Sequence, residues 1–340
     1  MNILITGGCG FVGSNVALYL KKKNPKYRLF LVDNFSRKGS KFNFLKLKKS
    51  SIKNYKINIT NFKKLNQLPS FNLVIDCCAE PSVEKSKFDM DKTFYTNLVG
   101  TYNICKLVIK NSANIIFLSS SRVYSIAQLN KLISKKISKN NLLKIDENFS
   151  TEQPVSLYGY TKISSEQLIK EMSFLKKFKF IINRCGVIAG PGQFGKVDQG
   201  FLSFFIWNVI NDIKIKFIGY GGSGDQIRDV LHIDDLCHLI DLQIKKLHKI
   251  NNKIFNVGGG RNSLISLKLL LKKITTLANK RPEIEKKPKT SFYDIPYYVT
   301  NNFKVNKFYN WQPKKDINNI IKDVYDWQIN NLNKIKKYFL

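Results

Sequence analysis

Tyr158 and Lys162 are the residues whose types and spacing are best suited to proton and hydride chemistry. They lie four positions apart at the start of a stretch with helical periodicity, so both side chains are expected on one helix face. A free tyrosine has a pKa of about 10, and a nearby ammonium group lowers that value. Such a Tyr158 can take a hydroxyl proton while the adjoining carbon gives up a hydride. The same spacing also describes a tyrosine beside a solvated lysine, so other residues must decide.

Three glycines near the N-terminus indicate where a cofactor would be held. Gly7, Gly10 and Gly13 follow the apolar stretch 3–5 and lead into a helical stretch at 15–20. A strand that turns through glycines into a helix leaves free N–H groups, which bind a pyrophosphate together with the positive end of the helix dipole. Taken alone, the triplet is equally typical of an ordinary tight turn.

Asp33 gives the glycine loop a more specific meaning. It ends the apolar stretch 27–32 and lies 20 residues after Gly13. A carboxylate at that position accepts hydrogen bonds from ribose hydroxyls and repels a 2′-phosphate, so we expect NAD rather than NADP. Arg37 and Lys38 follow closely, so this preference is not absolute.

Short apolar stretches alternate with helical patterns through the first half of the chain. This alternation predicts an α/β fold with a Rossmann-type, doubly wound parallel sheet, whose strand carboxyl ends form the ligand crevice. Gly7, Asp33, Ala79 and Ser120 all fall at such ends. The expected strands are 3–5, 27–32, 51–59, 72–76, 114–118, 178–182 and 253–257, and the expected helices include 97–109, 163–174, 201–212, 232–247, 264–277 and 317–338.

Two stretches of the second half are expected to be irregular. The polar stretch 125–152 reads as an insertion with a short helix at 129–137. The glycine-rich stretch 218–229 predicts a hairpin. Regular alternation stops near residue 183, which is the best candidate for a domain boundary.

Composition narrows the class of protein. The chain has 340 residues, 43% of them hydrophobic, with no apolar run as long as a membrane span and no secretory signal pattern at its start, so we expect a cytoplasmic protein. The net charge of +33 comes mostly from scattered lysines, whereas arginine is scarce, so no nucleic-acid or membrane partner is expected. The six cysteines form no C-x-x-C pair and are not spaced with the three histidines as ligands, so no metal site is expected.

On these residues the chain resembles the extended short-chain dehydrogenase/reductases of the NAD-dependent sugar-nucleotide epimerase/dehydratase family. The resemblance covers nearly the whole length and includes the glycine loop, Asp33, Asn97, Ser120, Tyr158, Lys162, and the segments 228–236 and 256–259. Within the family, the segments 33–39, 183–186, 192–200 and 226–232 are most similar to the CDP-paratose 2-epimerase type.

The resemblance implies a tightly held NAD and a catalytic set of Ser120, Tyr158 and Lys162. A hydroxyl carbon would be oxidised by hydride transfer, and the hydride would return to the other face of the keto intermediate, with Tyr158 as base and then acid. The carbon is C2 in a 2-epimerase. The implied cofactor-binding residues are Gly7, Gly10, Phe11, Val12, Gly13, Asp33, Asn34, Ser36, Arg37, Asn58, Ile59, Cys78, Ala79, Asn97, Tyr158 and Lys162.

The second lobe is expected to hold the nucleotide-diphosphate sugar. The implied substrate-binding residues are Ser121, Asn183, Gln193, Gln199 and Arg228. Arg228 could instead pair with Asp225 or Asp229. The resulting division is a NAD-binding domain over 1–183, rejoined by about 229–262, and a smaller mixed α/β lobe over 184–228 and 263–340. The resemblance also implies a homodimer or higher homo-oligomer, with the helices at 97–109 and 158–174 as the candidate surface.

Several departures from relatives bear on the reaction and the substrate. Ser121 and Arg122 stand where the 4,6-dehydratases carry an acidic pair, which disfavours dehydration. Ser291 stands where many relatives have a phosphate-binding Arg, and Asn58 and Asn301 replace usual Asp residues. A 4-epimerase or a keto-sugar reductase therefore stays open, and a non-catalytic NAD-binding or basic RNA-binding protein is the remote alternative.

Overall fold

A seven-stranded parallel sheet organises the N-terminal part of the protein. The computed structural model describes residues 1–133 and 142–339. The strand order is β10-β6-β5-β4-β1-β2-β3, and every neighbouring pair is parallel. The strands are β1 (Asn2–Thr6), β2 (Arg28–Asp33), β3 (Lys53–Lys56), β4 (Leu73–Asp76), β5 (Asn114–Ser120), β6 (Phe180–Cys185) and β10 (Lys253–Val257). This sheet confirms the predicted Rossmann-type fold.

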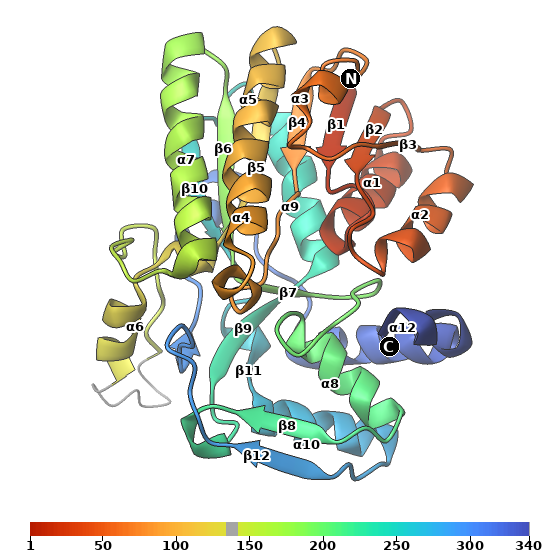
Figure 1. Cartoon of the computed structure of the whole chain (residues 1–340), viewed down its shortest axis with the longest axis vertical. Coiled ribbons are helices and arrows are strands. Elements are labelled where there is room, and N and C mark those ends of the chain that lie inside the picture. The colour runs from red at the N-terminus through yellow and green to blue at the C-terminus, as the bar shows by residue number, and fades with distance from the viewer. Residues whose placement is uncertain (134–141, 340) are drawn as a thin grey trace.

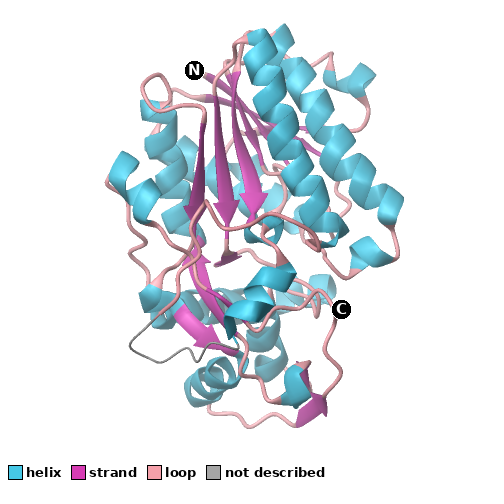
Figure 2. Cartoon of the chain, turned by 90° about the vertical axis from the view of Figure 1, so that its left-hand side faces the viewer, coloured by secondary structure: helices cyan, strands magenta, loops and turns pink. Residues whose placement is uncertain are grey.

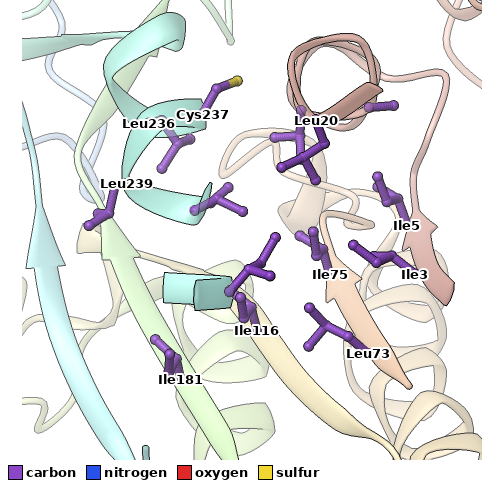
Figure 3. Close-up of a cluster of buried hydrophobic side chains, with 14 of the residues drawn as sticks. Ile3, Ile5, Leu20, Leu73, Ile75, Ile116, Ile181, Leu236, Cys237 and Leu239 are labelled. Atoms are coloured by element: carbon purple, nitrogen blue, oxygen red, sulfur yellow. The ribbon is translucent and has the colours of Figure 1, made fainter. Parts of the chain in front are cut away.

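Helices cover both faces of the sheet. One face packs against α1 (Phe11–Lys23), α2 (Ser40–Lys49), α9 (Ile233–Lys246) and α11 (Phe303–Tyr309). The other packs against α3 (Phe62–Leu65), α5 (Gly100–Lys110) and α7 (Ser156–Lys176). Figure 3 shows the first of these cores, where isoleucines of β1, β4, β5 and β6 meet leucines of α1 and α9. Because both faces are covered, the strands read as continuous apolar runs rather than as alternating ones.

Smaller sheets form the second part of the molecule, below the large sheet in Figure 1. The strand β9 (Ile227–His232) pairs with β7 (Val187–Ala189), β11 (Leu264–Ser266) and β13 (Tyr297–Tyr298). A separate pair joins β8 (Ile215–Ile218) to β12 (Ile284–Lys287). The helices α8 (Phe201–Ile210), α10 (Leu267–Ala278) and α12 (Ile317–Phe339) pack against these strands. Figure 2 shows the arrowheads of the large sheet pointing toward this part.

Short helices and turns complete the chain. They are α4 (Met90–Phe94), α6 (Ile126–Ile133), a π-helical turn at Tyr95–Val99, and 3₁₀ turns at Lys85–Lys87, Ser121–Val123, Tyr220–Gly222 and Arg261–Ser263. The helix expected at 129–137 begins earlier than predicted, and 134–137 lies outside the described residues. No helix in the described part of the chain is long and apolar enough to cross a membrane.

The hairpin predicted at 218–229 is wrong. The two strands in this stretch, β8 and β9, belong to different sheets and do not pair with each other. Glycines at 219, 221, 222 and 224 all have positive φ, so the chain turns repeatedly between the strands instead of folding back once.

Candidate functional site

The glycine loop lies between β1 and α1, at the carboxyl end of β1. Gly7 has a φ of +58°, and a Cβ there would lie 3.0 Å from the carbonyl oxygen of Cys77. A Cβ on Gly13 would come within 2.3 Å of the Gly7 carbonyl oxygen, so only glycine allows the helix to start this close to the strand. No side chain caps α1, and its first turn has no acidic residue. The loop therefore fits the pyrophosphate of a dinucleotide.

Asp33 is fixed beside this loop by backbone donors. The Cys9 N–H donates to its Oδ2 at 3.0 Å, and the Phe35 N–H donates to its Oδ1 at 2.7 Å. Burial raises the pKa of Asp33, while the N–H groups of Phe35, Cys9 and Gly10 oppose that rise. The structure thus brings Asp33 and the glycine loop together, as the sequence predicts, with the carboxylate where a ribose would need it.

The remaining predicted cofactor residues lie along the same edge of the sheet. Arg37 forms an ion pair with Glu80 at 2.7 Å, so its charge is already compensated. Asn34 and Ser36 are exposed just after β2, Asn58 accepts from the Thr60 N–H, Ile59 is buried, and Cys78 and Ala79 follow β4.

Asn97 connects this edge to α7. Its Oδ1 accepts from the Glu80 N–H at 2.8 Å, and its Nδ2 donates to the Glu80 carbonyl at 3.1 Å and to Thr161 Oγ1 at 3.0 Å. These bonds give Asn97 a positioning role for the segment that follows β4. Contact between Asn97 and a cofactor stays a prediction.

Ser120, Tyr158 and Lys162 come together at the carboxyl end of β5. Tyr158 shares a hydrogen bond with Ser120, and both Tyr158 and Lys162 lie on the buried face of α7. The Lys162 Nζ lies 3.9 Å from the centre of the Phe117 ring. The side chain of Tyr158 is 8% exposed and that of Lys162 only 2% exposed. The three residues predicted to be catalytic thus form one cluster.

The electrostatics of Tyr158 differ from the sequence expectation. Burial raises the pKa of Tyr158, and the groups of the protein that lower it are Ser120 and Arg122. Lys162 is not among these main groups, so the lowering of the Tyr158 pKa by its ammonium group stays a prediction. Burial dominates because the phenolate would lose its hydration inside the protein.

Asn183 is also misplaced by the sequence prediction. Its side chain is fully buried, and its amide exchanges two hydrogen bonds with Gln243 of α9, at 2.9 and 2.7 Å. Successive residues of a strand point to opposite faces, and here Arg184 points toward α7 instead. Asn183 therefore cannot contact a substrate.

Gln193 and Gln199 belong to a loop that packs against the first part of the molecule. Gln193 donates to the Ile188 carbonyl at 2.9 Å, and its Oε1 is buried with no partner among the described residues. Gln199 is exposed. The loop is tied to the large sheet's edge through Asn15, which donates to the Pro191 carbonyl at 3.3 Å, and through a Ser82–Asp198 hydrogen bond.

Arg228 lies in β9 and is held by groups from the segment before β13. It pairs with Asp294 at 3.3 Å and donates to the Ile295 carbonyl, so its carboxylate partner is neither Asp225 nor Asp229. Burial and the neighbouring Arg122 lower the pKa of Arg228 to about 10. Two guanidinium groups this close together favour an anionic ligand, because an anion would relieve their repulsion.

An open cavity of about 600 Å³ is lined in part by Asp294, the ion-pair partner of Arg228. It is lined by Ile126, Ala127, Asn130, Pro154, Tyr220, Thr290, Ser291, Phe292, Asp294 and Pro296. Lys87 lies near its edge, where it donates to Ser291 Oγ at 2.9 Å and pairs with Glu84 at 2.7 Å. Sequence reasoning missed Lys87 and Asp294, since one lysine among many carries no spacing signal.

Comparisons with known proteins define the class. Residues 3–258 match the family model described as "NAD dependent epimerase/dehydratase family". The chain therefore belongs to the NAD-dependent epimerase/dehydratase family, and the prediction of NAD as cofactor is confirmed at the level of that family.

Individual relatives are more distant. The chain is 27% identical to a CDP-paratose 2-epimerase of Salmonella typhi, covering 96% of this chain and 99% of the relative. It is also 27% identical to a UDP-glucuronate 4-epimerase of Thermodesulfobacterium geofontis, covering 98% of each. The structure of a UDP-glucuronic acid 4-epimerase from Bacillus cereus, in complex with UDP-glucuronic acid and NAD, superposes with a TM-score of 0.82 at 22% identity, covering 98% of this chain and all of that one.

Proposed function

We propose that this chain is a NAD-dependent nucleotide-sugar epimerase that works by transient oxidation of a hydroxyl carbon. The observation that carries the proposal is the buried cluster of Ser120, Tyr158 and Lys162 at the same sheet edge as the glycine loop and Asp33. The six free cysteines support a reducing compartment, for which we propose the cytoplasm.

Three side chains would carry the proton chemistry. NAD, when bound, would supply the hydride acceptor and then the donor, and the positive charge of its oxidised ring would favour the phenolate form of Tyr158. Tyr158 takes the proton of the substrate hydroxyl and later returns it to the carbonyl oxygen. Ser120, which already shares a hydrogen bond with Tyr158, would hold the same oxygen. The ammonium group of Lys162, which is buried in the same cluster, would stabilise the phenolate once it forms.

The residues after β5 support epimerisation rather than dehydration. Elimination of water needs an acid and a base, which Ser121 and Arg122 do not supply. The Arg122 guanidinium instead donates to the Tyr293 carbonyl at 3.1 Å and lies beside Arg228. Net reduction of a keto sugar is the alternative that uses the same residues.

For the substrate we propose a CDP-paratose-like nucleotide sugar, epimerised at C2. The similarity of segments 33–39 and 226–232 supports this choice, but a CDP-paratose 2-epimerase and a UDP-glucuronate 4-epimerase are equally similar in identity. We assign the diphosphate to Arg228 and Arg122. We also propose that Lys87 takes the place of the arginine that many relatives carry at position 291. The NAD-binding lobe would comprise residues 1–183 and about 229–262, together with α11, which packs against the large sheet, and the substrate lobe would comprise the rest.

Incubation with candidate sugars tests the proposed function. The purified protein is mixed with CDP-paratose, UDP-glucose and UDP-glucuronate in turn, and each sugar is followed by NMR. We expect an epimer at C2 from CDP-paratose without net consumption of NADH. An epimer at C4 of a UDP-sugar instead would identify the 4-epimerase, steady NADH consumption would identify a reductase, and no product from any of them would refute epimerisation.

We further propose a homodimer formed through α5 and α7. Large apolar side chains are exposed on these helices and the turn before them, with Tyr95 54%, Tyr102 45% and Phe174 69% exposed. Sedimentation of the wild-type protein and of Tyr102→Glu/Phe174→Glu tests this. We expect a dimer that becomes a monomer in the variant, and a wild-type monomer would contradict the proposal.

A further inference from the structure

Asp76 is a buried carboxylate that the proposed mechanism does not use. It ends β4 and is 1% exposed. Its Oδ1 accepts from the Thr6 hydroxyl and from the Cys78 N–H, whereas its Oδ2 has no hydrogen-bond partner among the described residues. A buried charge with an unpartnered oxygen is costly, so a positive charge nearby is required to compensate it.

Lys162 is the cation that lies on the same side of the sheet as Asp76. Asp76 and Phe117 are direct neighbours across the parallel pair of β4 and β5, so their side chains leave the same face of the sheet. The Lys162 Nζ lies 3.9 Å from the centre of that Phe117 ring, which places it over the residue beside Asp76. Lys162 is 2% exposed and has no carboxylate within 4.0 Å in the described part of the chain.

The other buried acid near Lys162 is already committed to another partner. Glu166 accepts from the Arg184 guanidinium at 2.7 Å and from Ser119 Oγ at 2.5 Å. Buried charges of alternating sign thus line the contact between α7 and the sheet. They follow in the order Asp76 of β4, Lys162 and Glu166 of α7, and Arg184 of β6. Because Arg184 already neutralises Glu166, Asp76 is the acid left to balance Lys162.

The protonation of Lys162 depends on these neighbours. Burial lowers the pKa of Lys162, and the groups that raise it are Asp76 first, then Glu166, and then the thiols of Cys78 and Cys185. Burial likewise raises the pKa of Asp76, and Lys162 is the main group that opposes this rise. Each charge therefore stabilises the other.

We propose that Asp76 is a positioning residue for the reaction, the counterion that keeps Lys162 protonated beneath Tyr158. The part of this proposal that concerns catalysis rests on the proposed function, because it presumes that Tyr158 needs the positive charge of Lys162. The pairing of Asp76 with Lys162 is independent of turnover.

The pH profile of Asp76→Asn tests the catalytic part. Removing the carboxylate lowers the pKa of Lys162 further, so Lys162 loses its proton at lower pH. We expect the alkaline limb of the kcat profile to move down by about one pH unit. Asp241→Asn is the control, because Asp241 is equally buried but pairs with Lys245 at 2.6 Å on α9, on the other side of the sheet. An unchanged alkaline limb in Asp76→Asn, or the same shift in Asp241→Asn, would overturn the proposal.

A double-mutant cycle in urea tests the pairing without any substrate. Asp76→Asn alone is expected to lower the unfolding midpoint, because Lys162 is left as an uncompensated buried charge. In a Lys162→Met background the same substitution is expected to raise the midpoint, because it then removes the orphaned carboxylate. Equal effects in both backgrounds would overturn the pairing. A sign reversal in a protein that epimerises no sugar would support the pairing and reject only the proposed function.

Discussion

Two neighbouring polar residues of β6 point to opposite faces of the large sheet and find different kinds of partner. Asn183 points toward α9 and exchanges two neutral hydrogen bonds with Gln243. Arg184 points toward α7 and pairs with Glu166, next to Lys162 and Asp76. A neutral amide pair is satisfied by itself, whereas buried charges need one another. At β6 the α9 side thus carries a neutral pair, whereas the α7 side carries a charged pair close to the residues that we propose to react.

Removing the phenol from the charged face should have the largest effect. Tyr158→Phe is expected to lower kcat about 10²- to 10⁴-fold, the usual contribution of general acid–base catalysis. Tyr160→Phe is the matched control, since Tyr160 lies on the exposed side of α7 and is 44% exposed. Both variants are assayed by NMR with the sugar that the wild type epimerises. Equal losses in the two would mean that the helix, and not the Tyr158 hydroxyl, matters.

Breaking the ion pair between Glu166 and Arg184 should lower the free energy of unfolding by the largest amount. Glu166→Gln leaves the Arg184 guanidinium buried without its counterion and is expected to lower the free energy of unfolding by about 3 kcal/mol. Urea unfolding measures this loss. A change below about 1 kcal/mol, typical of solvent-exposed ion pairs, would show that water reaches Arg184.

Adding a side chain within the glycine loop should lower stability by an intermediate amount. Gly13→Ala places a Cβ 2.3 Å from the Gly7 carbonyl oxygen, so α1 must shift, at an expected cost of about 1–3 kcal/mol. We expect bound NAD, measured by absorbance after denaturation, to fall with it. Gly186→Ala is the control, because its nearest neighbour is the Thr300 hydroxyl at 3.2 Å. Full NAD content in Gly13→Ala would exclude the loop as the pyrophosphate site.

Removing the hydrogen-bonded amide pair of Asn183 and Gln243 should have the smallest effect on stability and activity. Asn183→Leu with Gln243→Leu replaces both amides together, so no buried group is left unpaired, and the free energy of unfolding should change by about 1 kcal/mol or less. The rate of epimerisation should stay at the wild-type value. A large rise in KM would contradict the placement of Asn183 in the core and restore it as a substrate contact.

The contrast between Asn183 and Arg184 also shows which features could be predicted from the sequence and which could not. The glycine loop, Asp33 and the Tyr158–Lys162 pair were predictable because each depends on a short spacing within one strand, turn or helix. The alternation of elements likewise predicted the parallel sheet. In contrast, a strand covered on both faces is apolar on both, so the sequence did not reveal which face Asn183 takes and which face Arg184 takes.

The sequence by itself determined the fold class, and it singled out the glycine loop and the side chains that we propose to react, because these depend on neighbours along the chain. Only the tertiary structure decided their charge partners. Glu166 pairs with Arg184, Arg228 pairs with Asp294, and Asp76 acts on Lys162 from a neighbouring strand, all between residues far apart in the sequence. It also decided that β8 and β9 join different sheets. Burial sets the charge state of a side chain, and burial depends on elements that the chain brings together only when it folds.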